Sequence, residues 1–530
     1  MATVPMDGDG GLVDRLEARM ERLPSYRSFR LLALALLFAA NPVAAGQWDI
    51  SSRVSLAEIY TDNVNLDSEN EDSALITEIT PGISVHGSGG RFNANSDYRM
   101  QNFFSSEDDF SPNTSHQLVG NTNTEFAKNL FFLDAGARAG QAILDASDTR
   151  SRSNYTDNSN RTDFYGYSLS PYITPHFGSY AQGTLRYGYD RVVYSKGEAS
   201  DSETNRVDAN IVNGRYFSLL SWGGNYSYRK ETRDSGSASD VRYEQANGNA
   251  RFRLTRSFSL TGQAGYTNDD FNSSETRDNG GYWAVGGFWQ NSRFYSIEAQ
   301  KGNNLETATL GLYPTRRTSL VINYRDRDVG TNPGEVWTGT FSHYTRRSSW
   351  SASYIEDTTT SQQRQLGEGG FLLIDPISGE PNPNPQPGDV VVEVPLGPTS
   401  SLTNEVEERK RGQATVGLKT GKSGLRSTIF YEERKFLSSL EEEESRGIRG
   451  SWNWRFAPRT SSILTASFER TKDRNDSGDT DNWFVQTLVR RQVRTNLNAS
   501  LAYRFERQDS DGGDRDYDEN SLIARVTATF

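Results

Sequence analysis

Hydrophobic and polar residues alternate strictly at the end of the chain. The apolar positions of 521–530 are Leu522, Ala524, Val526, Ala528 and Phe530. The residues between them are polar, except for Ile523. Because successive side chains of a strand point to opposite faces, this pattern predicts a strand with one apolar and one polar face. A final strand of this kind is typical of outer-membrane barrels, and we expect Leu522, Val526, Ala528 and Phe530 to form the signal read by the barrel-assembly machinery.

The same alternation recurs from Trp48 onward, in segments of about ten residues. The connections between them are alternately short, as at 345–348 and 421–424, and long and acidic, as at 145–160 and 508–519. Short periplasmic turns and long external loops are the wiring of a transmembrane barrel. The chain therefore predicts an all-β fold, a closed antiparallel up-and-down β-barrel of about 24 strands, within a range of roughly 20 to 26.

The first hydrophobic segment predicts export. Two arginines precede an apolar run at 31–40, which is followed by small residues. This run is too short for a transmembrane helix and is typical of a secretory signal, with cleavage expected between Ala45 and Gly46. We expect residues 1–45 to be an N-terminal extension and signal peptide, for which Met20 offers a second start, and 46–530 to be the barrel. The predicted location is the outer membrane of a Gram-negative bacterium, reached through the periplasm.

The amino-acid composition excludes some partners and some kinds of site chemistry. The chain has a net charge of −12, a pI near 5.1 and 11% aromatic residues. The acidic balance argues against nucleic acid as a partner, whereas the lipid bilayer and lipopolysaccharide are expected partners. The absence of cysteine excludes disulfides and thiol chemistry. We expect no cofactor.

Eight charged residues fall on the predicted inner face of the strands. They are Arg186, Arg426, Glu432, Arg455, Glu469, Arg504, Glu506 and Arg525. One interpretation is structural, with ionic ladders that keep the barrel hydrated. The other is a mixed-sign path for a hydrophilic solute, because rings of charge tune selectivity in pores.

One connection is much longer than the rest. Residues 359–404 hold seven of the 17 prolines, flanked by the apolar runs 371–374 and 390–394. Either this segment is an external loop with its own small hairpin, or it folds over or into the lumen and sets the width of the pore.

The four histidines carry no recognisable site. His86, His116, His176 and His343 lie far apart without metal-ligand spacing, so we expect no metal site and solvated or lumen-facing histidines. His116 is the nearest candidate for a hydrolase, but no serine or acidic partner repeats a known arrangement. We therefore predict no catalytic residue and no enzyme activity.

The segment that begins at Trp48 carries a resemblance. Its core is Tyr60-Thr-Asp62-Asn63-Val-Asn65-Leu66. It resembles the start of the outer-membrane proteins associated with the PEP-CTERM (exosortase) system, which are similar to barrel porins found with extracellular-polysaccharide genes. The resemblance implies a barrel working beside exopolysaccharide export components and transfers no functional residue.

Three functions are consistent with these observations. The first is a porin-like channel or export conduit associated with exopolysaccharide and PEP-CTERM protein export. The second is a structural or adhesive barrel that displays acidic external loops, and an outer-membrane hydrolase is the least favoured.

Overall fold

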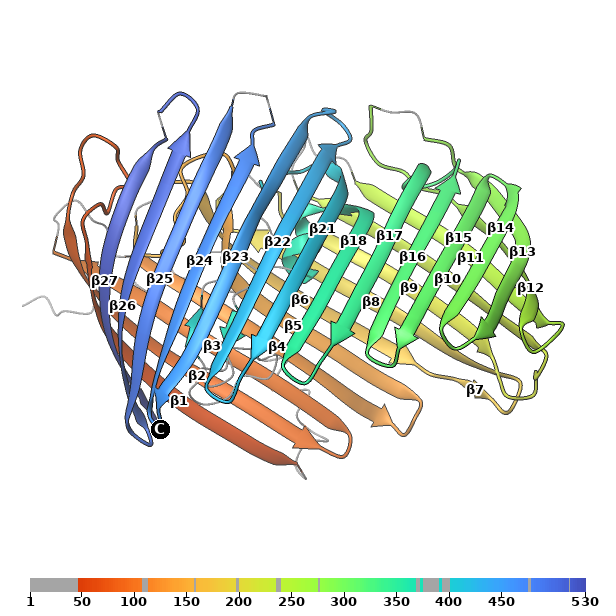
Figure 1. The fold of residues 1–530 in the computed structure, drawn as a ribbon, viewed down its shortest axis with the longest axis horizontal. Coiled ribbons are helices and arrows are strands. Elements are labelled where there is room, and N and C mark those ends of the chain that lie inside the picture. Colours follow the sequence, from red (N-terminus) through yellow and green to blue (C-terminus); the bar gives the residue numbers. More distant parts are fainter. Residues whose placement is uncertain are drawn as a thin grey trace, which may run out of the picture.

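The chain forms one closed barrel (Figure 1). The computed structural model describes residues 46–106, 113–156, 159–196, 200–234, 240–274, 277–367, 372–374, 390–392, 401–474, 478–513 and 515–530. Every neighbouring pair of strands is antiparallel, and β1 (Gln47–Thr61) pairs with β27 (Tyr517–Thr529) to close the sheet. The predicted barrel of 24 strands is confirmed. The predicted signal peptide and its cleavage site at Ala45 lie outside the described residues.

The strands differ in length around the barrel. The nine residues of β14 are enough to cross a bilayer as a tilted strand, whereas β2, β23 and β25 have 16. The remaining barrel strands are β2 (Ala74–Gly89), β3 (Phe92–Ser105), β4 (Asn113–Ala127), β5 (Phe131–Ile143), β6 (Arg161–Ile173), β8 (Ala181–Tyr194), β9 (Ser202–Asn213), β10 (Leu220–Arg233), β11 (Val241–Arg253), β12 (Phe258–Thr267), β13 (Gly280–Ser292), β14 (Tyr295–Asn303), β15 (Leu305–Thr315), β16 (Thr318–Arg327), β17 (Gly334–Tyr344), β18 (Ser348–Thr360), β21 (Val406–Lys419), β22 (Ser423–Phe436), β23 (Glu442–Ala457), β24 (Thr460–Lys472), β25 (Asp479–Arg494) and β26 (Leu497–Ser510). The two-residue β7 (His176–Phe177) continues β6 along β8. Helix α3 (Ser361–Gly367) and the hairpin of β19 (Leu372–Ile374) and β20 (Val390–Val392) lie between β18 and β21.

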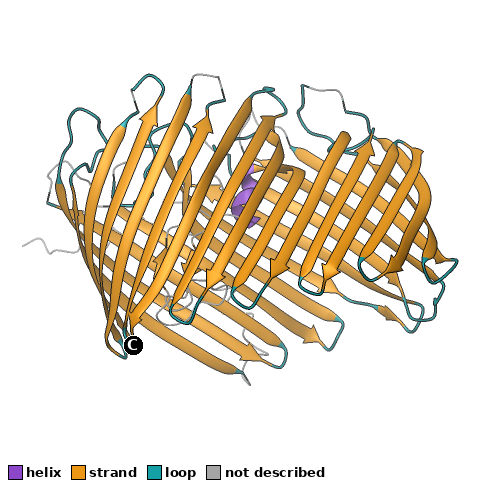
Figure 2. Cartoon of the chain, viewed as in Figure 1, coloured by secondary structure: helices purple, strands orange, loops and turns teal. Residues whose placement is uncertain are grey.

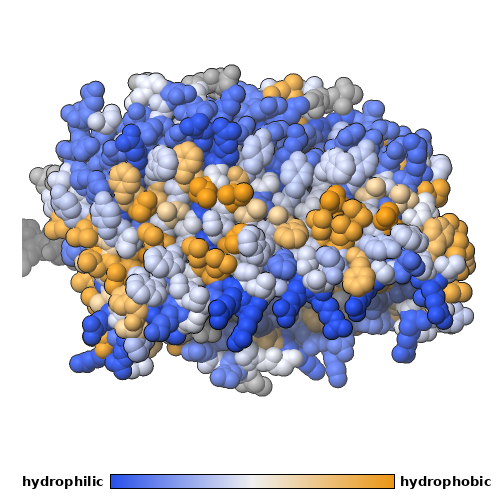
Figure 3. All heavy atoms as spheres, viewed as in Figure 1, coloured by the Kyte–Doolittle hydropathy of each residue, from blue (hydrophilic) through white to orange (hydrophobic). Residues whose placement is uncertain are grey.

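The outer face carries an apolar belt. Figure 3 shows hydrophobic residues in a band across the middle of the barrel, with hydrophilic residues above and below it. Leu522 and Val526 belong to the outward register of β27 and are 47% and 46% exposed. In a lipid bilayer this face meets hydrocarbon, and the closed sheet leaves no unpaired strand edge. No helix among the described residues is long and apolar enough to cross a membrane.

The short turns lie at the end of the barrel that also carries the last strand's C-terminus, which makes this the periplasmic end (Figure 1). At the other end, some predicted loops are shorter than expected. The predicted loop 508–519 is reduced to 511–516, because β26 continues to Ser510 and β27 starts at Tyr517. There Arg507 pairs with Asp509 and lies 3.7 Å from Asp518 on β27, so charged side chains extend the strands beyond the apolar belt.

The motif at 60–66, near the N-terminus, forms hydrogen bonds across the junction of β1 and β27, which we call the seam of the barrel. The carboxylate of Asp62 accepts hydrogen bonds from the backbone and the side chain of Asn520, at 2.7 and 2.8 Å. Asn63 is fully buried and donates to the carbonyl oxygen of Asp518 at 2.9 Å. At the periplasmic end, Phe530 and Ser52 exchange backbone hydrogen bonds. The first and last strands are therefore joined by side chains as well as by the ladder.

The remaining residues of the motif lie close by. Trp48 stacks on Phe92 with ring centroids 5.3 Å apart, Tyr60 is exposed on the outer register, and Asn65 donates to Asp72 at 3.0 Å. Gly46 is the first described residue.

One glycine pair, Gly286 and Gly287, lies inside β13. A Cβ on Gly286 of β13 would lie 1.8 Å from the carbonyl oxygen of Ala299 on β14. The absence of a side chain therefore permits the close approach of these two strands.

Candidate functional site

The connection between β5 and β6 folds into the barrel over its described residues, 144–156 and 159–160. Tyr155 is 3% exposed, and its hydroxyl lies 3.0 Å from Glu519 and 2.9 Å from Ser521 on β27. Its ring packs edge-on against Phe103 of β3, with centroids 6.5 Å apart. The hydroxyl of Ser151 donates to Glu506 on β26. This connection is therefore a constriction that occupies the interior and not an external loop. We call it the inner loop.

Apolar residues on the inner face of the barrel wall pack against the inner loop. The cluster around Tyr155 consists of Ala57, Ile59, Val64, Ala74, Ile76, Phe103, Ala502 and Ile523. Ile523, the one apolar residue on the polar face of the last strand, belongs to this cluster and is 8% exposed. An inward apolar side chain here is stabilised because the inner loop removes it from water.

Helix α3 crosses the lumen from the opposite wall. It follows β18 and contacts β6, which is almost halfway round the sheet in the strand order. Figure 2 shows the helix behind the near wall of strands. Leu366 packs against a second inward apolar cluster that includes Phe164, Val192 and Tyr194. The guanidinium of Arg364 lies 2.5 Å from the carboxylate of Glu407, and both side chains are buried.

The two inserted segments meet. The backbone N–H of Leu402 donates to the carbonyl oxygen of Leu144 at 2.9 Å, and the backbone N–H of Ala146 donates to the hydroxyl of Ser401 at 3.0 Å. Together they form a bridge across the external half of the lumen. We call α3 and residues 401–405 the crossing segment.

Both expectations for 359–404 are represented in the structure. The predicted apolar runs pair as β19 and β20, as a small hairpin requires. The crossing segment lies inside the barrel, as the pore-setting alternative requires. The proline-rich part, 375–389, lies outside the described residues.

Glu405 anchors the crossing segment to two external loops. Its carboxylate accepts hydrogen bonds from the hydroxyl of Ser438 and from the backbone N–H of Ser439, and it pairs with Arg474 at 2.8 Å. Partial burial acts to raise the pKa of Glu405, but these hydrogen bonds and the charge of Arg474 outweigh burial and hold the pKa below its ordinary value.

The eight charges predicted for the inner face lie at two levels. Glu432, Glu469, Arg504 and Glu506 are buried in the external half. Glu469 lies 4.0 Å from Arg150 of the inner loop and 4.0 Å from Arg449. Sequence reasoning missed these loop partners, because Arg150 stands in a segment as polar as an external loop.

The other four lie nearer the periplasmic end or at mid-height. Arg186 pairs with Asp134 at 2.5 Å, and Arg525 pairs with Glu78 at 2.6 Å. Arg426 and Arg455 are exposed near the periplasmic turns. The inner face is therefore accessible to water in its periplasmic half.

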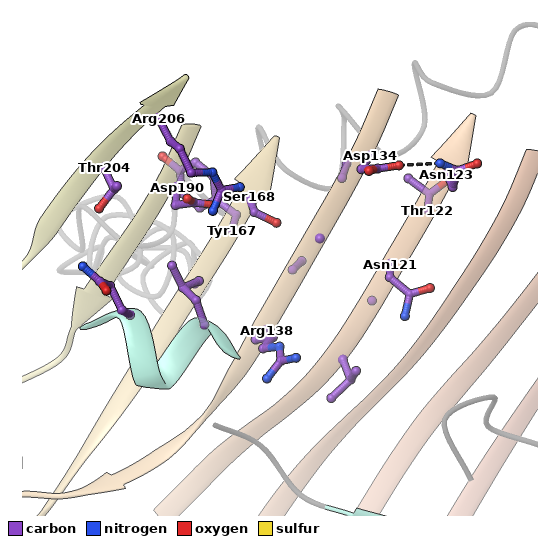
Figure 4. A pocket seen from close by; sticks show the side chains of 18 of the residues that line it. Asn121, Thr122, Asn123, Asp134, Arg138, Tyr167, Ser168, Asp190, Thr204 and Arg206 are labelled. Atoms are coloured by element: carbon purple, nitrogen blue, oxygen red, sulfur yellow. Dashed lines mark hydrogen bonds between the residues drawn. The ribbon is translucent and has the colours of Figure 1, made fainter. Parts of the chain in front are cut away.

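Two cavities line the same wall of the periplasmic half. The upper cavity, of about 590 Å³, lies beside α3 and is lined by Asn121, Asp134, Arg138, Asp190 and Arg206 (Figure 4). The lower cavity, of about 490 Å³, lies near the periplasmic turns and is lined by Phe132, His176, Gln182, Thr184 and Asn210. Neither cavity was predicted, because the residues of each come from four or more strands.

The histidines differ from expectation in one respect. His116 belongs to the outward register of β4, where its ring lies 2.9 Å from the hydroxyl of Tyr98. The expectation of a solvated or lumen-facing side chain was wrong for His116, because β4 begins at Asn113 and places it on the outer wall. His343 is also on the outward register, whereas His86 faces the lumen and His176 lies at a periplasmic turn.

A closed barrel of 24 strands with an apolar outer face and a hydrated, loop-filled interior is a large transmembrane β-barrel of the Gram-negative outer membrane. No protein-family model and no curated protein matches the chain.

Solved structures similar to this chain include large barrels. The apoprotein of the FrpB iron transporter from Neisseria meningitidis has a TM-score of 0.46 at 10% identity, covering 91% of this chain and 81% of its own. The siderophore receptor PiuA from Acinetobacter baumannii has a TM-score of 0.46 at 8% identity, covering 91% and 82%. An OmpT loop-deletion mutant, an outer membrane protein of Vibrio cholerae, has a TM-score of 0.30 at 7% identity, covering 92% and 100%. No functional argument follows from likenesses at this level.

Proposed function

We propose that this protein is a gated outer-membrane conduit for hydrophilic solutes. The observation that carries the proposal is the difference between the two halves of the lumen: the periplasmic half has exposed charged residues on its inner face, whereas two inserted segments meet across the external half. These segments are held by hydrogen bonds, ion pairs and small apolar clusters, so they can leave the lumen without breaking the barrel ladder. A barrel this wide has room for such segments, because strand side chains alone do not fill its interior.

We further propose that the conduit serves exopolysaccharide and PEP-CTERM protein export and works with export components. The resemblance of 48–66 to that group of barrels supports this assignment. The mixed-sign charges of the inner face support it too, because close pairing of opposite charges suits a neutral or weakly acidic polymer better than a small ion.

Planar-bilayer recordings test the conduit. We expect small or rare openings from the intact protein and a larger, steady conductance after removal of residues 361–403, because the crossing segment then no longer spans the lumen. Heat-modifiable migration on gels verifies that both proteins are folded barrels. If neither folded protein conducts, the proposal fails.

A second function is favoured by the contact between the two inserted segments. Two inserted segments that meet inside the lumen also suit a plugged scaffold whose external loops bind matrix or a partner. Shortening the external loop 234–240, between β10 and β11, separates the two functions, because the described contacts of Asp234 and Asp240 are to Asp201 and Lys230 and not to the inserted segments. Lost adhesion with unchanged conductance supports the scaffold, whereas unchanged adhesion argues against it.

A further inference from the structure

The two cavities of the periplasmic half lie on one wall and follow one another along it. On β5, Phe132 of the lower cavity and Asp134 of the upper cavity are successive inner-face residues. On β9, Asn210 and Arg206 belong to the lower and upper cavities and are separated by Asp208 alone on that face. The lining residues of the two cavities therefore follow one another along the wall, from the periplasmic turns to α3, and we call this row of residues the track.

A fixed aromatic stack stands at the junction of the cavities. The rings of Phe132 and Tyr172 are parallel to within 10°, with centroids 4.9 Å apart. The guanidinium of Arg186 covers the other face of Tyr172 at 4.0 Å and is itself held by Asp134 at 2.5 Å. Asn123 donates to the hydroxyl of Tyr172. The stack is thus held from one side, and Phe132, at its end, lines the lower cavity.

Three uncharged polar side chains beside this stack have no hydrogen-bond partner among the described residues. Within the part of the chain that the structure describes, the side chains of Gln182, Thr184 and Asn210 make no hydrogen bond to another residue. Inner-face amides elsewhere behave differently, since Gln263 donates to Gln300 at 2.8 Å. Amides and hydroxyls both donate and accept, so the lower cavity offers both roles to a ligand.

The charges where the two cavities meet are paired. Arg186 pairs with Asp134, and Arg206 lies 3.1 Å from Asp208. Such pairs leave little net field to attract a strongly anionic ligand. An uncharged ligand with many hydroxyl groups passes ion-paired side chains where the two cavities meet, and then charges of both signs, Asp190 and Arg229, on the wall of the upper cavity.

We infer that this track binds a neutral oligosaccharide, with Phe132 stacking on a sugar ring and Gln182, Thr184 and Asn210 bonding its hydroxyls. A pyranose ring presents C–H groups on its face and hydroxyls at its edge, which matches an aromatic face surrounded by amides. This inference rests on the proposed conduit and assigns the class of its cargo. The upper cavity then receives the next sugars of the chain beneath α3, where Gln363 is held by Arg229 at 2.8 Å.

Calorimetry on the full-length protein in detergent tests the track independently of conduction. The probes are maltohexaose, which is neutral, and hexagalacturonate, which is anionic. We expect maltohexaose to bind, and to bind at least about tenfold more weakly to Phe132→Ala/Asn210→Ala, since a ring contact and a hydrogen bond are lost. The matched control Gln263→Ala/Gln300→Ala removes two inner-face amides elsewhere and is expected to bind as the parent does.

The outcomes separate the track from the conduit. Binding with the expected variant pattern supports the track even if bilayer recordings show no conductance, in which case only the conduit fails. A conducting protein that binds neither probe overturns the track and leaves the conduit standing. Binding of hexagalacturonate alone, or equal weakening in the control variant, also overturns it. Heat-modifiable migration confirms that each variant is folded.

Discussion

Tyr155 holds the inner loop in the lumen, and its removal is expected to release that loop. Tyr155→Ala deletes a ring buried against Phe103 and a hydroxyl that contacts Glu519 and Ser521. Loss of a buried aromatic side chain costs about 3 kcal/mol or more, which corresponds to roughly a hundredfold shift toward the undocked loop. The barrel ladder does not depend on Tyr155, so we expect the fold to persist while the constriction opens.

Cysteine labelling measures this shift, because the chain has no cysteine of its own. Ser153, in the same loop, is 1% exposed, so a cysteine at that position should react slowly with a water-soluble maleimide. We expect labelling of Ser153→Cys to be roughly a hundredfold faster when Tyr155→Ala is added. Tyr155→Phe keeps the ring and should accelerate labelling only about fivefold, for a loss of about 1 kcal/mol. Equal labelling rates with and without Tyr155→Ala would show that the ring does not hold the loop, and would refute this reasoning.

Three further predictions concern the crossing segment, the seam and the wall. Because the folded-state pKa of Glu405 is depressed, its anchoring contribution is full above the ordinary carboxyl value of roughly 4.3 and is lost as the pH falls through the lower folded value. Channel openings should therefore increase on acidification below about pH 4, and Glu405→Gln should open at neutral pH and lose that part of the pH dependence. Asn63→Ala breaks a buried bond to the carbonyl of Asp518 and should lower barrel stability by about 1–3 kcal/mol, measured by denaturant titration of tryptophan fluorescence; an unchanged midpoint would contradict it. Gly286→Ala should greatly reduce folded, heat-modifiable protein, whereas Gly248→Ala, where a Cβ would meet no atom closer than 3.9 Å, should fold normally; equal yields would contradict the close approach of the strands.

The barrel wall could be predicted from the sequence because lipid imposes one rule on every strand. Outward positions such as Leu522 and Val526 must be apolar, so the alternation and the rhythm of connections gave the closed sheet and its strand number. The exact strand ends could not be predicted, because beyond the apolar belt both faces of a strand are polar and the alternation disappears, as at Arg507 and Asp518.

The filling of the lumen could not be predicted in the same way. The inner loop is as polar as an external loop, and its contacts come from strands hundreds of residues away, such as the bond between Tyr155 and Glu519. A signal was nevertheless present. Ile59, Phe103 and Ile523 are apolar on the face that should meet water, and such residues indicate where an inserted segment is seated.

The seam of the barrel has a consequence for biogenesis. Asp62 and Asn520 are 458 positions apart, yet they are hydrogen-bonded neighbours. Until the final strand arrives, the nascent sheet has two unpaired edges with free backbone donors and acceptors, and such edges recruit other chains. Biogenesis therefore depends on a chaperone that covers both unpaired strand edges until they pair with each other. A chain shortened by a single hairpin should aggregate instead of closing into a narrower barrel.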